Sequence, residues 1–362
     1  MQIKELGELA LIKRLAEQFA ASHPRVIKGI GDDASVTIQD ESTYLLCTTD
    51  TLVEDIHFSL KYTPSYNLGR KAVSISLSDI AAMGGTPTFL LASIILPVST
   101  TTDFVNLLYK GIKERAEEFD VKLIGGNTSS SPDKIIISTT MLGEVSKDRV
   151  VLREGASVGD NIYVTGRLGD SALGMKILNK IQESEVRPRM HLSGVGSQKP
   201  EKKKGNEIIT APFLKDAVTA HIDPCPRVRE GRKIAEKKLA TAMIDVSDGL
   251  ISDLRHIAEQ SAVGAKVWVE KIPISTGLKR WILDHPQDIM LALNGGEDYE
   301  LLFTASNKDV PKLETVSREL DIAITHIGEI VPKRNGINVL NKKGEVLNLT
   351  IEGFEHFKER QE

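Results

Sequence analysis

Three acidic residues gather near the start of the chain, each beside a predicted turn or strand end. Asp32 and Asp33 follow a glycine turn, and Asp50 follows an apolar run that predicts a buried strand. At about 5 Å and an effective dielectric near 20, each pair of such carboxylates repels by roughly 3 kcal/mol. No lysine or arginine lies between Lys28 and Lys61 to neutralise them. A hard cation such as Mg²⁺ is therefore the favoured partner.

A second acidic turn follows a strand predicted over 241–244. Asp245 and Asp248 bracket the start of the helix predicted from residue 250 onward. Ser247 or Asp248 could act simply as the N-cap of that helix. One cap requires only one of these side chains, so the others remain available for chemistry.

Two further acidic positions lie near glycines. Asp79 lies within the helix predicted over 67–83, among apolar and small residues. The alternative to a functional role is that its side chain simply faces solvent. Glu297 lies in the glycine-rich turn 295–298, which precedes a strand predicted over 301–304. A role for either residue depends on whether folding brings it to the other acids.

A glycine pair with polar neighbours follows another short predicted strand. The strand covers 121–124, and Gly125, Gly126 and Asn127 come directly after it. Paired glycines let the backbone approach a ligand closely, and the amides and hydroxyls that follow can hold phosphate. The same pattern is typical of an ordinary loop, so the motif alone does not assign a site.

Hydrophobic periodicity divides the rest of the chain into helices and strands. Helices are predicted over 5–20 and 67–83, and Thr102 is predicted to cap a further helix. The apolar run before Asp50 predicts a strand over 44–49. Further strands are predicted over 89–96, 134–142 and 162–165.

A polar, glycine-rich segment near 150–153 predicts a boundary between two domains. We assign residues 1–152 to the first domain and residues 153–362 to the second. Residues 183–207 are polar and aperiodic, which predicts a mobile surface insertion whose lysines are solvated.

The composition is that of an ordinary globular protein and limits the classes of partner. The 362-residue chain is 41% hydrophobic and 27% charged, with a net charge of −4. This charge argues against a nucleic-acid binder, and no apolar run approaches the roughly 20 residues of a membrane span. Cys47 and Cys225 are the only cysteines, and they match neither a disulfide framework nor a zinc site. Together with the lack of a signal-peptide core, these features predict a cytoplasmic protein.

Seven motifs occur in an order that resembles one known family. They are Gly29-Ile-Gly-Asp-Asp-Ala34, Thr49-Asp-Thr51 with His57, Ser76-Leu-Ser-Asp-Ile-Ala-Ala-Met-Gly84, Leu123-Ile-Gly-Gly126, Ile162-Tyr-Val-Thr-Gly166, Ile244-Asp-Val-Ser-Asp-Gly-Leu250 and Gly295-Gly-Glu-Asp-Tyr-Glu-Leu301. Their order resembles that of the thiamine-monophosphate kinases, members of the aminoimidazole-ribonucleotide-synthetase-like ATP-binding superfamily. The resemblance covers residues 25–357.

The resemblance implies a mixed α/β (α+β) fold with two domains. The N-terminal α/β domain would bind ATP and Mg²⁺ and pair its sheet with that of a second copy in a homodimer, and the C-terminal domain would be α+β. It also implies ATP-dependent phosphorylation of thiamine monophosphate to thiamine diphosphate, by direct γ-phosphoryl transfer assisted by several Mg²⁺ ions. Such a transfer requires positioning and charge neutralisation rather than a covalent nucleophile.

The resemblance also assigns roles to individual residues. Implied metal ligands are Asp33, Thr48, Thr49, Asp50, Asp79, Asn127, Asp245 and Asp248. Implied ATP contacts are Tyr109, Gly126, Asn127, Arg153 and Ser247. Implied catalytic residues are Asp50, Asp248 and Arg153. Implied substrate contacts are His57, Glu297 and Phe354. Packing of the tail is the alternative role for Phe354. Asp32 is expected to support the metal ligands without binding the metal directly.

One position departs from the family pattern. The family usually has Gly-Gly-Asp-Thr where this chain has Gly125-Gly126-Asn127-Thr128. A carboxylate that ligates Mg²⁺ is thereby replaced by a neutral amide, which still offers an oxygen. We therefore expect an active kinase with a higher magnesium requirement.

Two alternatives remain open. One is another ATP-using synthetase of the superfamily, acting on a purine precursor, selenide or a carbamoyl group. Those proteins share the glycine-acid turns but chiefly lack the combination of the motifs at 76–84 and 295–301. The other is a nucleotide-binding regulatory protein that has lost catalysis. Asn127 would be its first sign of decay, although five of the expected carboxylates remain.

Overall fold

The computed structural model describes residues 3–19, 22–186 and 212–347. The strands are β1 (Val26–Lys28), β2 (Ser35–Ile38), β3 (Thr43–Val53), β4 (Thr86–Pro97), β5 (Lys122–Ser131), β6 (Ile136–Ser146), β7 (Asn161–Thr165), β8 (Ala242–Asp245), β9 (Val263–Trp268), β10 (Leu301–Ala305), β11 (Ile324–Pro332) and β12 (Ile337–Leu340). The helices are α1 (Ile3–Leu6), α2 (Glu8–Phe19), α3 (Ser65–Ala82), α4 (Thr102–Glu117), α5 (Asp170–Val186), α7 (Pro212–Ile222), α8 (Val228–Glu236), α9 (Leu250–Gln260), α10 (Thr276–Asp284), α11 (Leu291–Asn294) and α12 (Val310–Leu320).

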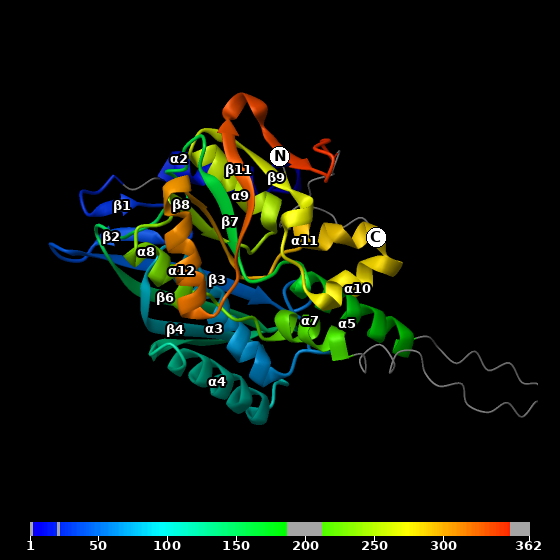
Figure 1. The fold of residues 1–362 in the computed structure, drawn as a ribbon. Helices are drawn as coiled ribbons and strands as arrows, with labels where there is room; N and C mark the ends of the chain where they lie inside the picture. The colour runs from blue at the N-terminus through cyan, green and yellow to red at the C-terminus, as the bar shows by residue number, and fades with distance from the viewer. Residues whose placement is uncertain (1–2, 20–21, 187–211, 348–362) are drawn as a thin grey trace, which may run out of the picture.

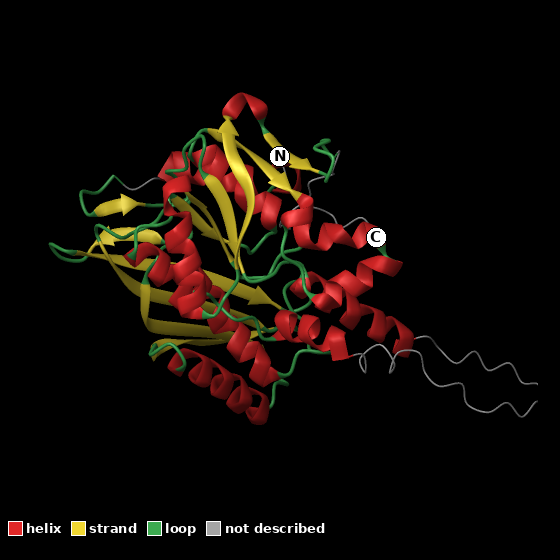
Figure 2. Cartoon of the chain, viewed as in Figure 1, coloured by secondary structure: helices red, strands yellow, loops and turns green. Residues whose placement is uncertain are grey.

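Two mixed sheets of six strands each organise the described chain (Figures 1 and 2). The first has the order β1-β2-β3-β6-β4-β5, and the second has the order β12-β9-β11-β7-β10-β8. The pairs β4–β5 and β12–β9 are parallel, and the other neighbours are antiparallel. The chain passes from the first sheet to the second between residues 146 and 161. The mixed α/β fold expected from the sequence is confirmed.

Helices fill the space between the two sheets. Helix α3 is buried along most of its length and packs against β3 and β6 on one side and against α8 and β8 on the other. Figure 1 shows α4 outside α3, at the bottom of the view. Alternate residues of the second sheet enter different cores: Tyr163 and Phe303 join the core around α3, whereas Ile162 and Leu302 join the core around α9. The layers are therefore sheet, helices, sheet and helices, with α3 in the middle.

Two strand predictions were wrong at positions that matter for the site. Strand β3 continues through Asp50 to Val53, so Asp50 lies within the strand rather than after it. The glycine pair is not a loop either, because it lies within the edge strand β5. At Gly126 φ is 157°, and a Cβ would lie 1.8 Å from the carbonyl oxygen of Ala92. Glycine is thus required there by close strand packing.

Two helix ends also differ from the prediction. The helix predicted over 5–20 is divided at Gly7, where φ is 77°, into α1 and α2. Thr101 rather than Thr102 caps α4, because its hydroxyl accepts the third N–H of the helix.

Part of the predicted insertion is regular structure. Helix α5 continues to Val186, so residues 183–186 are helical. The rest of the segment 183–207 lies outside the described residues, as does Phe354.

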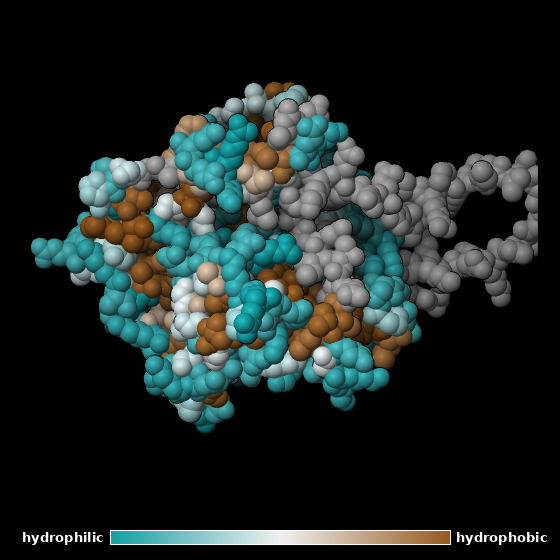
Figure 3. Space-filling model, turned by 90° about the horizontal axis from the view of Figure 1, so that it is seen from above, coloured by the Kyte–Doolittle hydropathy of each residue, from teal (hydrophilic) through white to brown (hydrophobic). Residues whose placement is uncertain are grey.

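The surface is of mixed polarity. The face drawn in Figure 3 is mostly hydrophilic, with separate hydrophobic patches. Among the described helices, none combines the length and apolar character needed to cross a membrane.

The crossing of α3 and α4 requires two glycines. A Cβ on Gly69 would lie 2.1 Å from the carbonyl oxygen of Leu108, and a Cβ on Gly111 would lie 2.0 Å from that of Tyr66. Both contacts are with backbone atoms, which cannot move without shifting a helix. The position of α3, and of the side chains it carries, depends on this close approach.

We predict that Gly111→Ala lowers the free energy of unfolding by about 2–4 kcal/mol, because the added methyl group forces the helices apart. Urea denaturation measures the change. The control is Gly29→Ala, whose Cβ would have Val26 Cγ1 at 4.0 Å as its neighbour, and it should shift the value by less than about 0.5 kcal/mol. A wild-type midpoint for Gly111→Ala would contradict the close crossing.

Candidate active site

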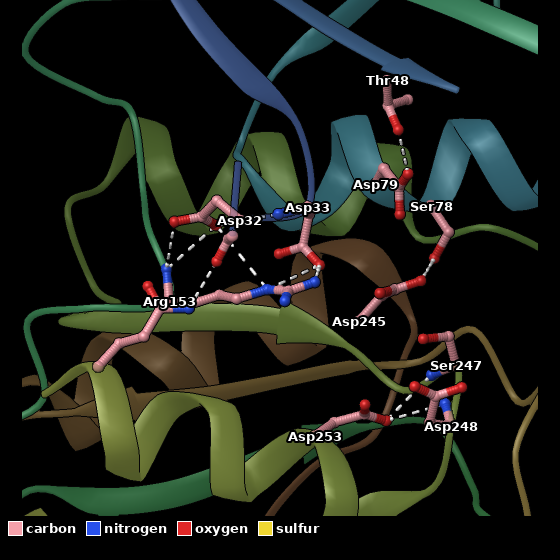
Figure 4. Close-up of polar contacts among 12 residues, drawn as sticks. Asp32, Asp33, Thr48, Ser78, Asp79, Arg153, Asp245, Ser247, Asp248 and Asp253 are labelled. Carbon is pink, nitrogen blue, oxygen red and sulfur yellow. Dashed lines mark hydrogen bonds and ion pairs between the residues drawn. The ribbon is translucent and has the colours of Figure 1, made fainter. Parts of the chain in front are cut away.

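Three of the predicted carboxylates meet between the two sheets (Figure 4). Asp33 precedes β2, Asp79 lies on α3, and Asp245 is the last residue of β8. One carboxylate oxygen from each lies within 4.8 Å of the other two. Asp79 therefore does not face solvent, which was the plain alternative. The acidic triad, as we call these three residues, combines side chains from the turn before β2, from α3 and from the end of β8.

Serine hydroxyls of α3 hold two of the acids in place. Ser78 donates a hydrogen bond of 2.6 Å to Asp245, and Ser76 donates one of 2.7 Å to Asp50. Asp50 thus lies next to the acidic triad, on the face of β3 that α3 covers. Neither serine was a candidate from sequence, because a serine inside a helix gives no signal of its distant partner.

Thr48 and Thr49 point to opposite faces of β3. Thr48 is buried and donates its hydroxyl to Asp79. Thr49 is exposed, and its hydroxyl donates to the carbonyl oxygen of Thr139 instead. Only the main chain of Thr49 could reach the acidic triad.

Burial and mutual repulsion oppose ionisation of these acids. Burial, followed by repulsion from Asp33, raises the pKa of Asp245 to about 8. Burial, followed by the charge of Asp50, raises the pKa of Asp79 well above its ordinary value. Burial also raises the pKa of Asp50, although the hydrogen bond from Ser76 opposes this shift. Protons therefore occupy part of the group at neutral pH unless a cation replaces them.

Arg153 brings a positive charge to the group from the segment between the two sheets. Its Nη2 lies 2.6 Å from Asp33 Oδ1, and its main-chain N–H donates to Asp32 Oδ2 at 3.3 Å. Asp32 also lies 3.5 Å from the Nζ of Lys28. Asp32 thus holds Arg153 in place and stays outside the acidic triad. The stretch between Lys28 and Lys61 supplies no basic side chain, and the basic partner of Asp33 comes from Arg153, which is distant in sequence.

The residues present fit a hard divalent cation. Asp33 Oδ2 is buried and makes no hydrogen bond to any described residue. Leaving a buried carboxylate oxygen without a partner is costly. The other donors of the acidic triad are also carboxylate oxygens, which are the ligands that Mg²⁺ prefers.

Asp248 lies apart from the acidic triad, in a second group with Asp253 and His256. Neither Ser247 nor Asp248 is the N-cap of α9, which was the structural alternative for these two residues. The N-cap residue is Gly249, and Asp253 Oδ2 accepts the N–H groups of Ser247, Asp248 and Gly249 at 3.1, 3.2 and 3.1 Å. An acidic residue one turn inside a helix is a signal that could have identified this role.

The two described substrate candidates meet at a buried lysine. Lys71 Nζ lies 2.8 Å from Glu297 Oε1 and 3.5 Å from the carbonyl oxygen of His57. The other oxygen of Glu297 lies 3.3 Å from His221 Nδ1. Neither Lys71 nor His221 was a candidate from sequence.

Three of the nucleotide candidates, Tyr109, Gly126 and Asn127, lie away from the acidic triad. Asp50 and Gly126 belong to one row of paired residues that crosses β3, β6, β4 and β5. Three strand spacings of about 4.8 Å separate them by roughly 14 Å. Asn127 is exposed on β5, and Tyr109 lies partly buried on α4. Within one chain these residues do not join the acids.

Comparison with known proteins indicates the family of this chain. The family described as AIR synthase related protein matches through its N-terminal domain at residues 31–145 and through its C-terminal domain at residues 157–340. The thiamine-monophosphate kinase of Bacillus subtilis (strain 168) is 35% identical over 336 residues, which are 93% of this chain and 95% of that protein. This chain belongs to the thiamine-monophosphate kinase family. The resemblance seen in the sequence is confirmed.

Solved structures of the family have the same fold. AaThiL complexed with AMPPCP and TMP has a TM-score of 0.79 and 32% identity, and the match covers 98% of this chain and 99% of that one. The thiamine-monophosphate kinase from Stenotrophomonas maltophilia K279a has a TM-score of 0.71 and 31% identity, covering 93% and 96% of the two chains. Escherichia coli HypE, at 18% identity and a TM-score of 0.64, shares the fold alone.

In EDTA, we predict that the free energy of unfolding falls by at least about 1 kcal/mol between pH 6 and pH 8.5. Because the pKa of Asp245 rises from 3.8 to about 8 on folding, the folded protein binds more protons than the unfolded chain in this range. The stabilisation that protonated Asp245 gives to the folded protein is complete below pH 3.8 and is lost as the pH rises through about 8. Urea denaturation at the two pH values measures the change.

Asp245→Asn is the matched variant for this test, because it keeps the shape of the side chain and cannot ionise. Its stability should depend less on pH than that of the wild type. An equal dependence in both proteins would contradict the assignment to Asp245.

Proposed function

We propose that this protein transfers the γ-phosphoryl group of ATP to thiamine monophosphate and so forms thiamine diphosphate. The observation that carries this proposal is the acidic triad, which lies beside Arg153 in a chain that belongs to this family. The complex of AaThiL with AMPPCP, an analogue of ATP, and TMP supports the same pair of ligands here.

We assign the acidic residues to binding of Mg²⁺ and the guanidinium group of Arg153 to binding of phosphate. The proposed metal ligands are Asp33, Asp50, Asp79, Asp245 and Asp248, with Thr48, Thr49 and Asn127 as neutral oxygen donors. Bound Mg²⁺ neutralises phosphate charge during the transfer. Ser76 and Ser78 orient two of the carboxylates, and Arg153 presents a guanidinium group that can pair with phosphate oxygens. The phosphate of the substrate is the acceptor, so the chain binds, orients and neutralises rather than acting as a nucleophile.

The other contacts follow the family positions. We assign Tyr109, Gly126, Asn127 and Ser247 to ATP, and His57, Glu297 and Phe354 to thiamine monophosphate. The meeting of His57 and Glu297 at Lys71 supports a single substrate region.

We further propose a homodimer formed through the first sheet. Strand β5 is an edge strand and is exposed along almost its whole length. Leu123 and Ile124 on β5, and Phe89 on β4, are exposed hydrophobic residues. An exposed edge strand is a ready template for pairing with a second copy. Gly126 and Asn127 lie on this edge, which supports a site that is complete only in the dimer.

The remaining assignments follow from this function. Residues 1–152 form the proposed domain for ATP, Mg²⁺ and dimerisation, and residues 153–362 form the second domain. A cytoplasmic location and small-molecule partners, rather than nucleic acid or membrane, suit a kinase of thiamine monophosphate.

Incubation with ATP, Mg²⁺ and thiamine monophosphate should yield thiamine diphosphate, detected by chromatography. We predict that Asp50→Asn keeps the fold but lowers turnover by at least about 100-fold, because a metal carboxylate becomes a neutral amide. Asp103→Asn is the control, since Asp103 is exposed on α4 and its change should leave turnover within about twofold.

Two results would change the proposal. Binding of ATP without product would favour the regulatory protein, whereas phosphorylation of a different acceptor would favour the synthetase. Turnover like that of the wild type in Asp50→Asn would remove Asp50 from the site.

We predict that Asn127→Asp lowers the Mg²⁺ concentration needed for half-maximal activity by about threefold or more, because a carboxylate binds Mg²⁺ more tightly than an amide. Titration of Mg²⁺ at saturating ATP measures both curves. The control is Asn106→Asp on the exposed face of α4. Coinciding curves for wild type and Asn127→Asp would show that residue 127 does not affect the metal.

A further inference from the structure

We propose that Lys71 is a positioning residue that fixes Glu297 for contact with thiamine monophosphate. This inference rests on the proposed function. Lys71 lies on α3 with 1% of its side chain exposed, and its Nζ lies 2.8 Å from Glu297 Oε1. The same Nζ lies 3.5 Å from the carbonyl oxygen of His57. One ammonium group therefore touches both described residues of the proposed substrate region.

The exposure of the two side chains decides which of them meets the ligand. A quarter of the Glu297 side chain is exposed, whereas Lys71 is enclosed. Burying an ammonium group is costly unless a carboxylate pairs with it. The Lys71 side chain is therefore held by its partner, and Glu297 presents its remaining hydrogen-bonding capacity to the site.

His221 completes the surroundings of Glu297 without supplying the charge. Its Nδ1 lies 3.3 Å from Glu297 Oε2 and 3.2 Å from the hydroxyl of Ser171. Burial lowers the pKa of His221, so the ring is neutral at physiological pH. Burial alone would raise the pKa of Glu297, but the charge of Lys71, followed by the contact with His221, holds it below its ordinary value. Lys71 thus helps to keep Glu297 ionised.

The loop around Glu297 is anchored independently of Lys71. Asp298 accepts the N–H groups of Gly169 and Ser171 at 2.7 and 3.2 Å. Glu300 pairs with the guanidinium group of Arg227. Loss of Lys71 should therefore release the Glu297 side chain while the loop keeps its path.

The test compares four proteins by steady-state kinetics: wild type, Lys71→Met, Glu297→Gln and the double variant. In Lys71→Met, we expect KM for thiamine monophosphate to rise at least about tenfold, with kcat and KM for ATP within about threefold. The double variant should lose no more than Glu297→Gln alone, because Lys71 acts through Glu297. Lys113→Met is the control, since Lys113 is 70% exposed, and it should behave as wild type.

Urea denaturation of the same proteins keeps the test informative if stability changes. Lys71→Met leaves the Glu297 carboxylate without its cation and should lower the midpoint, and Glu297→Gln in the same chain should restore part of it. Equal rises in KM for both substrates, or additive losses in the double variant, would assign Lys71 a purely structural role and overturn the proposal.

Calorimetric titration with thiamine monophosphate separates this proposal from the proposed function. Failure of the wild type to form thiamine diphosphate while it binds thiamine monophosphate would overturn the proposed function alone. Weaker binding by Lys71→Met would then still support the positioning role, and unchanged binding would overturn it. A wild type that binds no thiamine monophosphate would overturn both.

Discussion

Repulsion among buried carboxylates is the constraint on which the rest of the structure depends. Asp33, Asp79 and Asp245 hold oxygens within 4.8 Å of one another, and Arg153 pairs directly with one of them. At such separations each ionised pair costs roughly 3 kcal/mol. Because the acids come from different elements, this repulsion tends to push the two sheets apart. Packing around α3 must offset this repulsion, and protons or a cation must remove the repulsion that remains.

Helix α3 contacts both halves of the chain through polar residues on two of its faces. Ser76 and Asp79, three residues apart, meet Asp50 and Thr48 of β3. Lys71 and Ser78, two turns apart, meet Glu297 and Asp245 of the second half of the chain. A single rigid element thus sets the distance between Asp50 of β3 and Asp245 of the second sheet. The close glycine crossing with α4 matters for the same reason, since it fixes where α3 lies.

Local patterns in the sequence identified the acids but not their surroundings. Gly31 marked the turn that contains Asp33, Gly249 marked the turn that begins at Asp245, and helical periodicity located Asp79 on α3. Strand β3 extends beyond Asp50 because it pairs with β6 along its whole length, and that pairing is not local. The same holds for Lys71, whose partner Glu297 lies more than two hundred residues away in the sequence. Contacts of this kind depend on the fold, so no window of residues reveals them.

The site has two regions of different electrostatic character, and this difference favours a different kind of ligand in each region. In the acidic triad, the carboxyl groups outnumber the single positive charge of Arg153 and their ionisation is opposed, so a ligand that brings cations can replace the protons there. Around Glu297 the charge is already matched by Lys71, so a ligand gains little by bringing charge and more by matching hydrogen bonds. A nucleotide that carries Mg²⁺ suits the first region. A substrate recognised by the shape and hydrogen bonding of its organic part suits the second, and the transferred group lies between them under the proposed function.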